Sequence, residues 1–343
     1  MLRRQSFLVG GVLLAALSGC ASSSSVEVNP NERVGDIRSN DVWKTGTQLT
    51  GVVRIYEGAT VEIEPGAHIT CTDATQIIVG GTLRVQGGTA HASITCPSWS
   101  GFLVATNGSL DITGLDIENA STGYETQTGA GSVNLTDSRI TSSTRPFTVR
   151  AGSTLTVTHV TATTPAAVQG NYNVSVSEIY GTFNAHYLSY DASSNEGIMT
   201  MRDGTTDIED STLQGAQNGF DLVSAYGAKS VTVKYTTMTG AHCGNHIDAS
   251  KDADHVPTKS FLFDHVTADS NQFGITIYAT STDGTLVVKD SNFIGLNSWI
   301  DIEGDHGVIT FQNVFTSGRA LVMNTDPPTF GTTPTRIADA KPR

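Results

Sequence analysis

A short phrase that alternates apolar with polar residues returns along most of this 343-residue chain. Such alternation is the period of a half-buried β-strand. Three copies share a DS dipeptide: VNLTDSRI at 133–140, TDIEDSTL at 206–213 and LVVKDSNF at 286–293. With weaker copies included, the third residue falls at 63, 85, 112, 135, 157, 176, 208, 233, 263, 288 and 311, and most steps measure 22 to 27 residues. One unit of this length cannot bury its own apolar face, whereas stacked units can.

The repeat therefore predicts an all-β fold, a right-handed parallel β-helix of about 11 coils that spans residues 41–324. Each strand would pair in parallel with its equivalents in the coils above and below, about 4.8 Å away. Parallel crossovers are almost always right-handed. Gly, Asn, Asp and Ser gather between the copies, as turns require. A β-sandwich of many short strands is the alternative, but it does not account for equivalent phrases at near-constant spacing.

The first 19 residues are ordered like a signal peptide for export. Arg3 and Arg4 precede an apolar run at 7–17 that is too short to span a bilayer. The sequence LSGC at 17–20 resembles the bacterial lipoprotein signal, which implies a lipid anchor on Cys20 and a location at the outer membrane or cell surface. An ordinary signal peptide is the alternative. We expect residues 20–40 to form a flexible tether and residues 325–343 to form a disordered tail.

The charge of the chain limits its partners. The formal net charge is −13 at pH 7. Nucleic-acid binding needs dense Lys and Arg, so nucleic acid is excluded as a partner. A polyanion would need a cation to mediate its binding.

The opening repeats carry a resemblance to a known family. TVEIEPGAHITC at 60–71, GGTLRVQGGTAHASITC at 80–96 and GSLDITGLDIENA at 108–120 resemble the first coils of bacterial β-helix proteins of the pectate-lyase-like superfamily. That superfamily includes lyases, hydrolases, epimerases and adhesins, so the resemblance predicts the fold far better than the function.

Two cysteines occupy the same place in consecutive repeats, in ITC at 69–71 and ITC at 94–96. Their Cα atoms would lie about 4.8 Å apart, so Cys71 and Cys96 are candidates for a disulfide in an oxidising compartment. A stack of two buried thiols is the alternative. Cys243 is left without a partner, and we expect it to be a buried structural residue rather than a catalytic one.

Alternation in the second strand of four consecutive repeats predicts an outward column of Asp221, Asp248, Thr276 and Asp301. Carboxylates one coil apart suit Ca²⁺ ligation, with Asp221 and Asp248 as ligands, or the acid pair of a glycosidase. The family resemblance implies calcium-binding acids on such a face. His246 lies two residues before Asp248 and therefore on the same face.

Other residues complete this hypothesis. Arg202 or His246 would be the acid–base partner of the aspartates, although Arg202 matches no motif of the lyases. Trp299, Tyr278 and Glu303 flank the column and would contact a sugar. Three functions follow: a cell-envelope β-helix that binds polysaccharide on its lateral face, a polysaccharide lyase or glycoside hydrolase, and a structural or adhesive surface protein whose acidic face is merely solvated.

Overall fold

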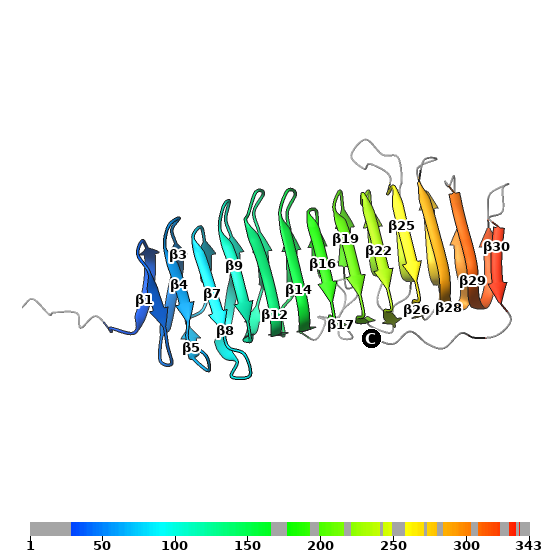
Figure 1. The fold of residues 1–343 in the computed structure, drawn as a ribbon. Coiled ribbons are helices and arrows are strands. Elements are labelled where there is room, and N and C mark those ends of the chain that lie inside the picture. Colours follow the sequence, from blue (N-terminus) through cyan, green and yellow to red (C-terminus); the bar gives the residue numbers. More distant parts are fainter. Residues whose placement is uncertain are drawn as a thin grey trace, which may run out of the picture. The chain divides into compact units, whose positions relative to one another are not determined.

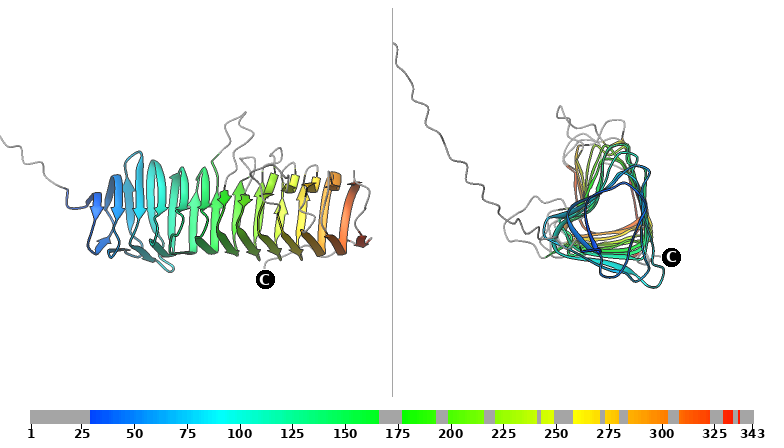
Figure 2. Two further views of the ribbon diagram at one scale, coloured as in Figure 1. Left: turned by 90° about the horizontal axis from the view of Figure 1, so that it is seen from above. Right: turned by 90° about the vertical axis from the view of Figure 1, so that its left-hand side faces the viewer.

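The computed structural model describes residues 29–165, 177–192, 199–215, 221–240, 243–248, 258–270, 273–279, 284–302, 308–322, 329–333 and 336. All thirty regular elements in these ranges are β-strands. They wind into a right-handed parallel β-helix, as the repeat predicts (Figure 1). The end-on view shows that the coils enclose a three-sided interior (Figure 2). We call the three sides sheets A, B and C.

Sheet A carries the repeated phrases of the sequence, and its strands lie side by side along the β-helix in Figure 1. It contains β2 (Asp41–Trp43), β4 (Thr60–Ile63), β7 (Thr82–Gln86), β9 (Ser109–Thr113), β16 (Thr182–His186), β19 (Thr205–Glu209), β22 (Ser230–Lys234), β25 (Ser260–Asp264) and β30 (Thr329–Thr333). It also contains the first parts of four long strands, β12 (Ser132–Thr141), β14 (Thr154–Thr163), β28 (Thr285–Ile302) and β29 (Val308–Val322). These long strands turn the corner into sheet B, and β28 and β29 continue into sheet C.

Sheet B continues from that corner. It contains β5 (His68–Cys71), β10 (Leu115–Ala120), β17 (Ser189–Ala192), β20 (Thr212–Gly215), β23 (Thr237–Thr239) and β26 (Thr267–Ser270). Sheet C contains β1 (Glu32–Ile37), β3 (Gln48–Ile55), β6 (Thr75–Val79), β8 (Ala92–Val104), β11 (Thr122–Thr126), β13 (Arg145–Val149), β15 (Ser177–Ile179), β18 (Met199–Arg202), β21 (Asp221–Tyr226), β24 (Cys243–Asp248) and β27 (Phe273–Ala279). Strands β3 and β8 begin in sheet B.

The register of sheet A matches the repeat at every aligned position except one. Ile63 pairs with Val85, and the match continues through Val288 and Phe311 at the other end. The aligned position 176 is wrong, because Ala185 of β16 stands between Val157 and Ile208. The sequence alignment used the phrase at 174–181, which contains β15 of sheet C. Strand β16 of sheet A begins only a short turn later.

The interior is filled by apolar side chains from all three sheets. Trp43, Trp99, Tyr124, Phe147 and Phe183 are among its largest fully buried members. Rings stack between coils, as with Phe102 and Tyr124, whose centroids lie 5.0 Å apart. Each such side chain contributes about 1.5–3 kcal/mol on burial, so this core holds the coils together.

The corner between sheets A and B explains the DS phrases. Its apex residue has a left-handed backbone in coil after coil: Asp137, His159, Tyr187, Asp210, Tyr235, His265, Asp290 and Asn313, with φ between 45° and 56°. Asp and Asn tolerate this conformation better than most residues. We call this line of residues the corner row. The residue after the apex points inward, and in three coils it is the Ser of the DS phrase.

The predicted ends of the β-helix need correction. Strand β1 lies within the segment predicted as a tether, and β30 lies within the predicted tail. Residues 1–28, including Cys20 and the predicted signal peptide, lie outside the described residues. No helix long and apolar enough to cross a membrane occurs in the part of the chain that the structure describes.

Cys71 of β5 and Cys96 of β8 form a disulfide, with 4.9 Å between their Cα atoms. The neighbouring pairs Ile69–Ile94 and Thr70–Thr95 fix this register. The side chain of Cys243 is not described.

Candidate binding site on the outer face of sheet A

The predicted outward column on sheet C is wrong in two of its three steps, from Asp221 to Asp248 and from Asp248 to Thr276. Asp221 pairs with Cys243, and Asp248 pairs with Tyr226 and Ala279. Asp221, Asp248 and Asp301 therefore do not form one row. The prediction took the apolar residues of FDL at 220–222 as the inward positions of this strand. In the structure the inward positions of β21 are Val223 and Ala225.

The row that contains Asp301 is made of other residues. Thr200, Ser224, His246, Thr276 and Asp301 succeed one another along sheet C, so only the Thr276–Asp301 step was predicted. Thr276 is 2% exposed and Asp301 7% exposed. These positions do not form the solvent-open face that a polymer site requires.

The remaining predicted site residues are placed as follows. Arg202 is partly buried and pairs with Tyr226. Glu303 and the side chains of Asp221, Asp248 and Tyr278 lie outside the described residues.

Trp299 was predicted to point outward beside Asp301, and this is wrong. It is 4% exposed, and its ring packs edge-on against Phe311 with the centroids 5.2 Å apart. Ser298, Trp299 and Ile300 are all buried, because a register shift between Ser298 and Ile300 interrupts the alternation. An indole buried in this way cannot stack on a sugar ring.

Sheet A, by contrast, presents outward rows that are polar over most of their length. The row farthest from the corner is almost entirely hydroxylic: Thr60, Thr82, Ser109, Ser132, Thr154, Thr182, Thr205, Ser230, Ser260 and Thr285. The middle row reads Glu62, Arg84, Asp111, Asn134, Thr156, Asn184, Asp207, Thr232, Leu262 and Val287. Successive members stand about 4.8 Å apart.

A hollow of about 190 Å³ lies in the centre of this face, over β14, β16 and β19. Its polar lining consists of Thr156, Asn184, His186, Asp207 and Glu209, and no Lys or Arg lines it. We call it the central hollow. Its hydroxyl, amide, imidazole and carboxylate groups can accept or donate hydrogen bonds. A second hollow of about 410 Å³ lies on the same face over β2, β4 and β7, where Glu62 and Arg84 are among the lining residues.

The corner row orients the imidazole of the central hollow. His186 Nε2 lies 3.0 Å from Asp210 Oδ2, and the side chain of Asp210 is only 3% exposed while that of His186 is 44% exposed. The ring of Tyr187 stacks on His186 at 4.0 Å between centroids and on His159 at 4.5 Å. A buried carboxylate and a stacked ring hold His186 in one orientation at the rim of the hollow.

Sequence reasoning missed the central hollow for a specific reason. Asp207 and Glu209 stand in the phrase TDIEDSTL at 206–213, where alternation places both on the outer face. The neighbouring coil was aligned on VSVSEIYG at 174–181 instead of TFNAH at 182–186, which hid Asn184 and His186. Correct alignment of that one coil would have brought the four residues together.

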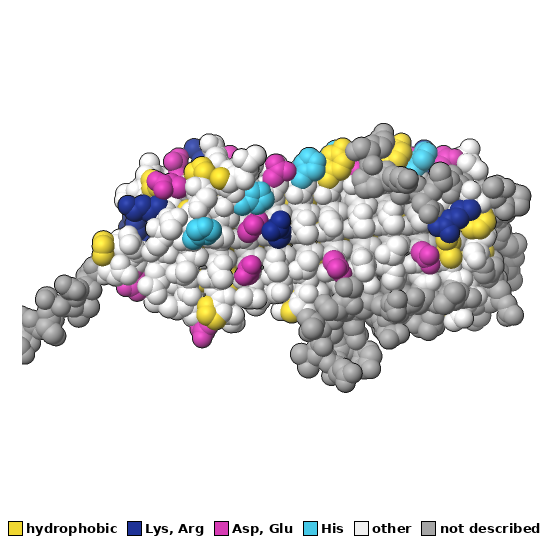
Figure 3. Space-filling view, turned by 90° about the horizontal axis from the view of Figure 1, so that it is seen from below, with side chains coloured by type: hydrophobic (Ala, Val, Ile, Leu, Met, Phe, Trp, Pro, Cys, Tyr) yellow, Lys and Arg dark blue, Asp and Glu magenta, His cyan; other side chains and the backbone are white. Residues whose placement is uncertain are grey.

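The surface chemistry of the described residues is polar rather than apolar. Their exposed large hydrophobic residues are four valines: Val34, Val42, Val52 and Val308. Figure 3 shows charged and histidine side chains scattered over a largely uncharged surface. Comparisons with protein-family models, with curated proteins and with solved structures found no match for this chain. The function must therefore be argued from the geometry of the face.

Proposed function

We propose that this chain is a cell-envelope β-helix protein that binds a linear polysaccharide along the outer face of sheet A. The central hollow, set within rows that are polar over most of their length, is the observation that carries the proposal. The export signal and the LSGC sequence support anchoring through a lipid on Cys20, at the outer membrane or cell surface.

The proposal follows from the match between a long, regular surface and a long, regular ligand. Each coil repeats its outward side chains about 4.8 Å from the last, so a polymer can make many similar contacts in sequence. Sugar hydroxyls both donate and accept hydrogen bonds, as do the hydroxyl and amide groups of these rows. A polymer with many weak contacts gains its affinity through their number.

The charges favour a neutral polysaccharide over an acidic one. Asp207 and Glu209 line the central hollow, and no cationic Lys or Arg does. The whole chain carries a net charge of −13. An acidic polysaccharide would meet like charges here, and Asp221 and Asp248, which do not share a row of sheet C, supply no calcium site to offset them.

A glycan array probed with the full chain, with and without calcium, tests this function. Neutral polysaccharides should be retained, and Asp207→Ala should weaken their binding by about tenfold, because a hydrogen bond to a charged group contributes about 1.5–3 kcal/mol. Asp111→Ala is the matched control, since Asp111 occupies the same outward row but lines neither hollow. It should weaken binding less than Asp207→Ala does, because Asp111 would make only one of the many weak contacts along the row.

The same experiment separates the other functions. Release of shorter glycans from the array would favour a lyase or hydrolase. Equal loss of binding in Asp111→Ala and Asp207→Ala would contradict the central hollow as the site. Retention of no glycan under either condition would contradict the proposal and favour a structural or adhesive role.

A further inference from the structure

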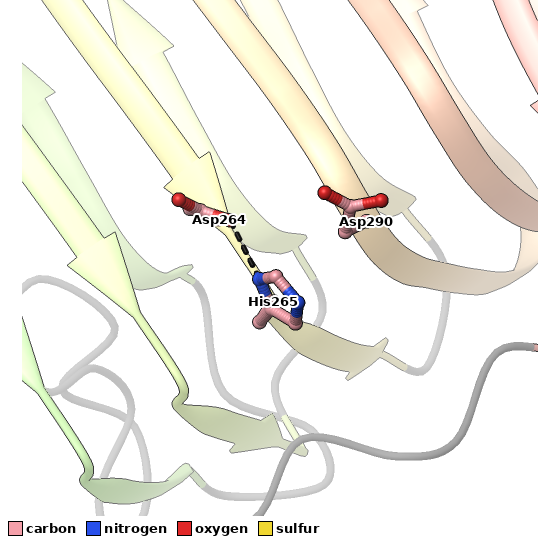
Figure 4. A group of neighbouring side chains, drawn as sticks. All are labelled: Asp264, His265 and Asp290. Carbon is pink, nitrogen blue, oxygen red and sulfur yellow. Dashed lines mark hydrogen bonds and ion pairs between the residues drawn. The ribbon is translucent and has the colours of Figure 1, made fainter.

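Three potential metal ligands meet on the corner row, two and three coils beyond the central hollow. Asp264 ends β25, His265 forms the next corner, and Asp290 forms the corner of the following coil (Figure 4). One ligand atom from each residue lies within 4.8 Å of the other two. Among the residues that the structure describes, no other group of three His, Cys, Asp or Glu meets this condition.

We propose that Asp264, His265 and Asp290 bind a divalent transition-metal ion of the zinc type, independently of any polysaccharide. One imidazole with two carboxylates is a ligand set for Zn²⁺, Co²⁺ or Ni²⁺. Ca²⁺ and Mg²⁺ prefer oxygen ligands alone, so the imidazole selects against them.

The geometry needs only side-chain rotation to hold an ion. With metal–ligand bonds of about 2.1 Å, the ligand atoms of a bound ion stand about 3–3.5 Å apart. The side chain of His265 is 46% exposed and that of Asp264 is 13% exposed. His265 lies on the surface, so rotation about its side-chain bonds can close the remaining gap without moving the backbone.

Neighbouring side chains contact two of the ligands. The ring of Tyr235 stacks on His265 with the centroids 4.9 Å apart. Asn313 Nδ2, from the next coil, donates a hydrogen bond of 2.7 Å to Asp290 Oδ1. Partners of this kind orient metal ligands in known sites.

Lys289 forms an ion pair with the carboxylate of Asp264, which would also bind the metal. Lys289 Nζ lies 2.9 Å from Asp264 Oδ2, and His265 Nδ1 lies 2.7 Å from Asp264 Oδ1. Burial acts to raise the pKa of Asp264, but hydrogen bonds and charge from Lys289 and His265 more than offset it and lower the pKa overall. The side chain of Lys289 is 38% exposed, and an ion pair with one partner at the surface contributes little, so a divalent ion can displace the ammonium group.

The corner row supplies its own control. His159 occupies an equivalent corner and lies 3.5 Å from Asp137, its single carboxylate partner in the described structure. His159 and Asp137 belong to no three-ligand group among the described residues. Substitution of His159 therefore removes an imidazole of the same type without touching the proposed site.

Titration of the metal-free full chain with Zn²⁺ by calorimetry, and with Co²⁺ by visible absorption, tests the proposal. We expect His265→Asn and Asp290→Asn each to weaken binding by at least about tenfold, the loss seen when even a supporting partner is removed. Asn tolerates the left-handed corner, so both variants should keep the fold. Thermal melts of both variants would check that the fold is kept.

Two further variants complete the experiment. His159→Asn should bind Zn²⁺ as the unaltered chain does, and Lys289→Met should bind it more tightly because the competing cation is gone. Unchanged affinity in His265→Asn, or equal losses in His265→Asn and His159→Asn, would overturn the proposal. Tighter binding of Ca²⁺ than of Zn²⁺ would overturn it as well.

Discussion

At the scale of single residues, the DS phrase is a device for turning a corner. The left-handed Asp redirects the chain from sheet A to sheet B, and the Ser that follows is buried. Ser211 Oγ donates to the carbonyl of Glu209 at 2.7 Å and accepts the amide of Leu188, one coil away, at 3.0 Å. Ser138 and Ser291 make the equivalent contacts. The hydroxyl thus satisfies backbone groups that the corner would otherwise leave unpaired in the core.

Ser211→Ala should therefore destabilise the chain although it removes a single oxygen atom. The buried amide of Leu188 would lose its partner, which costs about 1–3 kcal/mol. Urea unfolding followed by circular dichroism measures the effect. Ser189→Ala, at an exposed position of β17, is the control and should leave the midpoint unchanged. Equal midpoints for the two variants would show that the hydroxyl of Ser211 does not support the corner.

At the scale of strands, stacking turns distant residues into neighbours. Cys71 and Cys96 are 25 residues apart in the chain, and one coil of the β-helix brings them together. The disulfide joins β5 to β8 and so ties two coils near the start of the β-helix. Because coils contact mainly their neighbours, its effect should be strongest in this part of the chain.

Reduction of this disulfide should lower stability locally. Closing a loop of this length contributes about 3 kcal/mol in the chain-entropy model. Amide hydrogen exchange on oxidised and reduced chains should show faster exchange in β3 to β8 after reduction and little change in β19 to β25. Uniform protection of β5 and β8 in both forms would contradict this stabilising role.

At the scale of the whole β-helix, the first coil exposes strand edges that invite association. Charged side chains occupy these edges. Arg33 Nε pairs with Asp41 at 2.6 Å, and Asp36 pairs with Arg38 at 2.8 Å and with Arg54 at 3.4 Å. Charged edges oppose strand pairing between molecules, so we expect these pairs both to close the first coil and to oppose association of copies.

Acid should loosen this end of the β-helix. Burial acts to raise the pKa values of Asp36 and Asp41, but their arginine partners more than offset it and lower both pKa values below the usual range of an aspartate. A lowered folded-state pKa means that the stabilisation is present above the unfolded value and is lost as pH falls through the folded value. Below about pH 4, we expect faster exchange in β1 and β2 and growth of larger species in light scattering.

A variant separates this effect from general acid unfolding. Asp41→Asn should produce part of the same exchange and association at neutral pH, because it removes the partner of Arg33 without protonating any other group. A monodisperse chain with protected β1 in Asp41→Asn would contradict the proposed role of the edge charges.

The architecture can be predicted from the amino-acid sequence, because stacking follows from a repeat that recurs regularly and whose apolar residues alternate. The register of sheet A follows from the positions of Ile63, Val85 and their successors, and the disulfide register follows from two copies of ITC. Within one strand the period of two also decides which side chains point outward. The outward orientation of Asp207 and Glu209 can be predicted from this period.

Which outward residues become neighbours between coils depends on the packing of the complete fold. Loops of unequal length and register shifts, as at Trp299, move a strand by a residue or more, and a shift of one reverses every side chain. Small inward residues such as Ala225 and Ala185 carry no pattern strong enough to fix the alignment locally. The sheet C row that contains Thr276 and Asp301, the corner row and the central hollow all depend on those shifts. The shifts in turn depend on how each strand packs against the whole core.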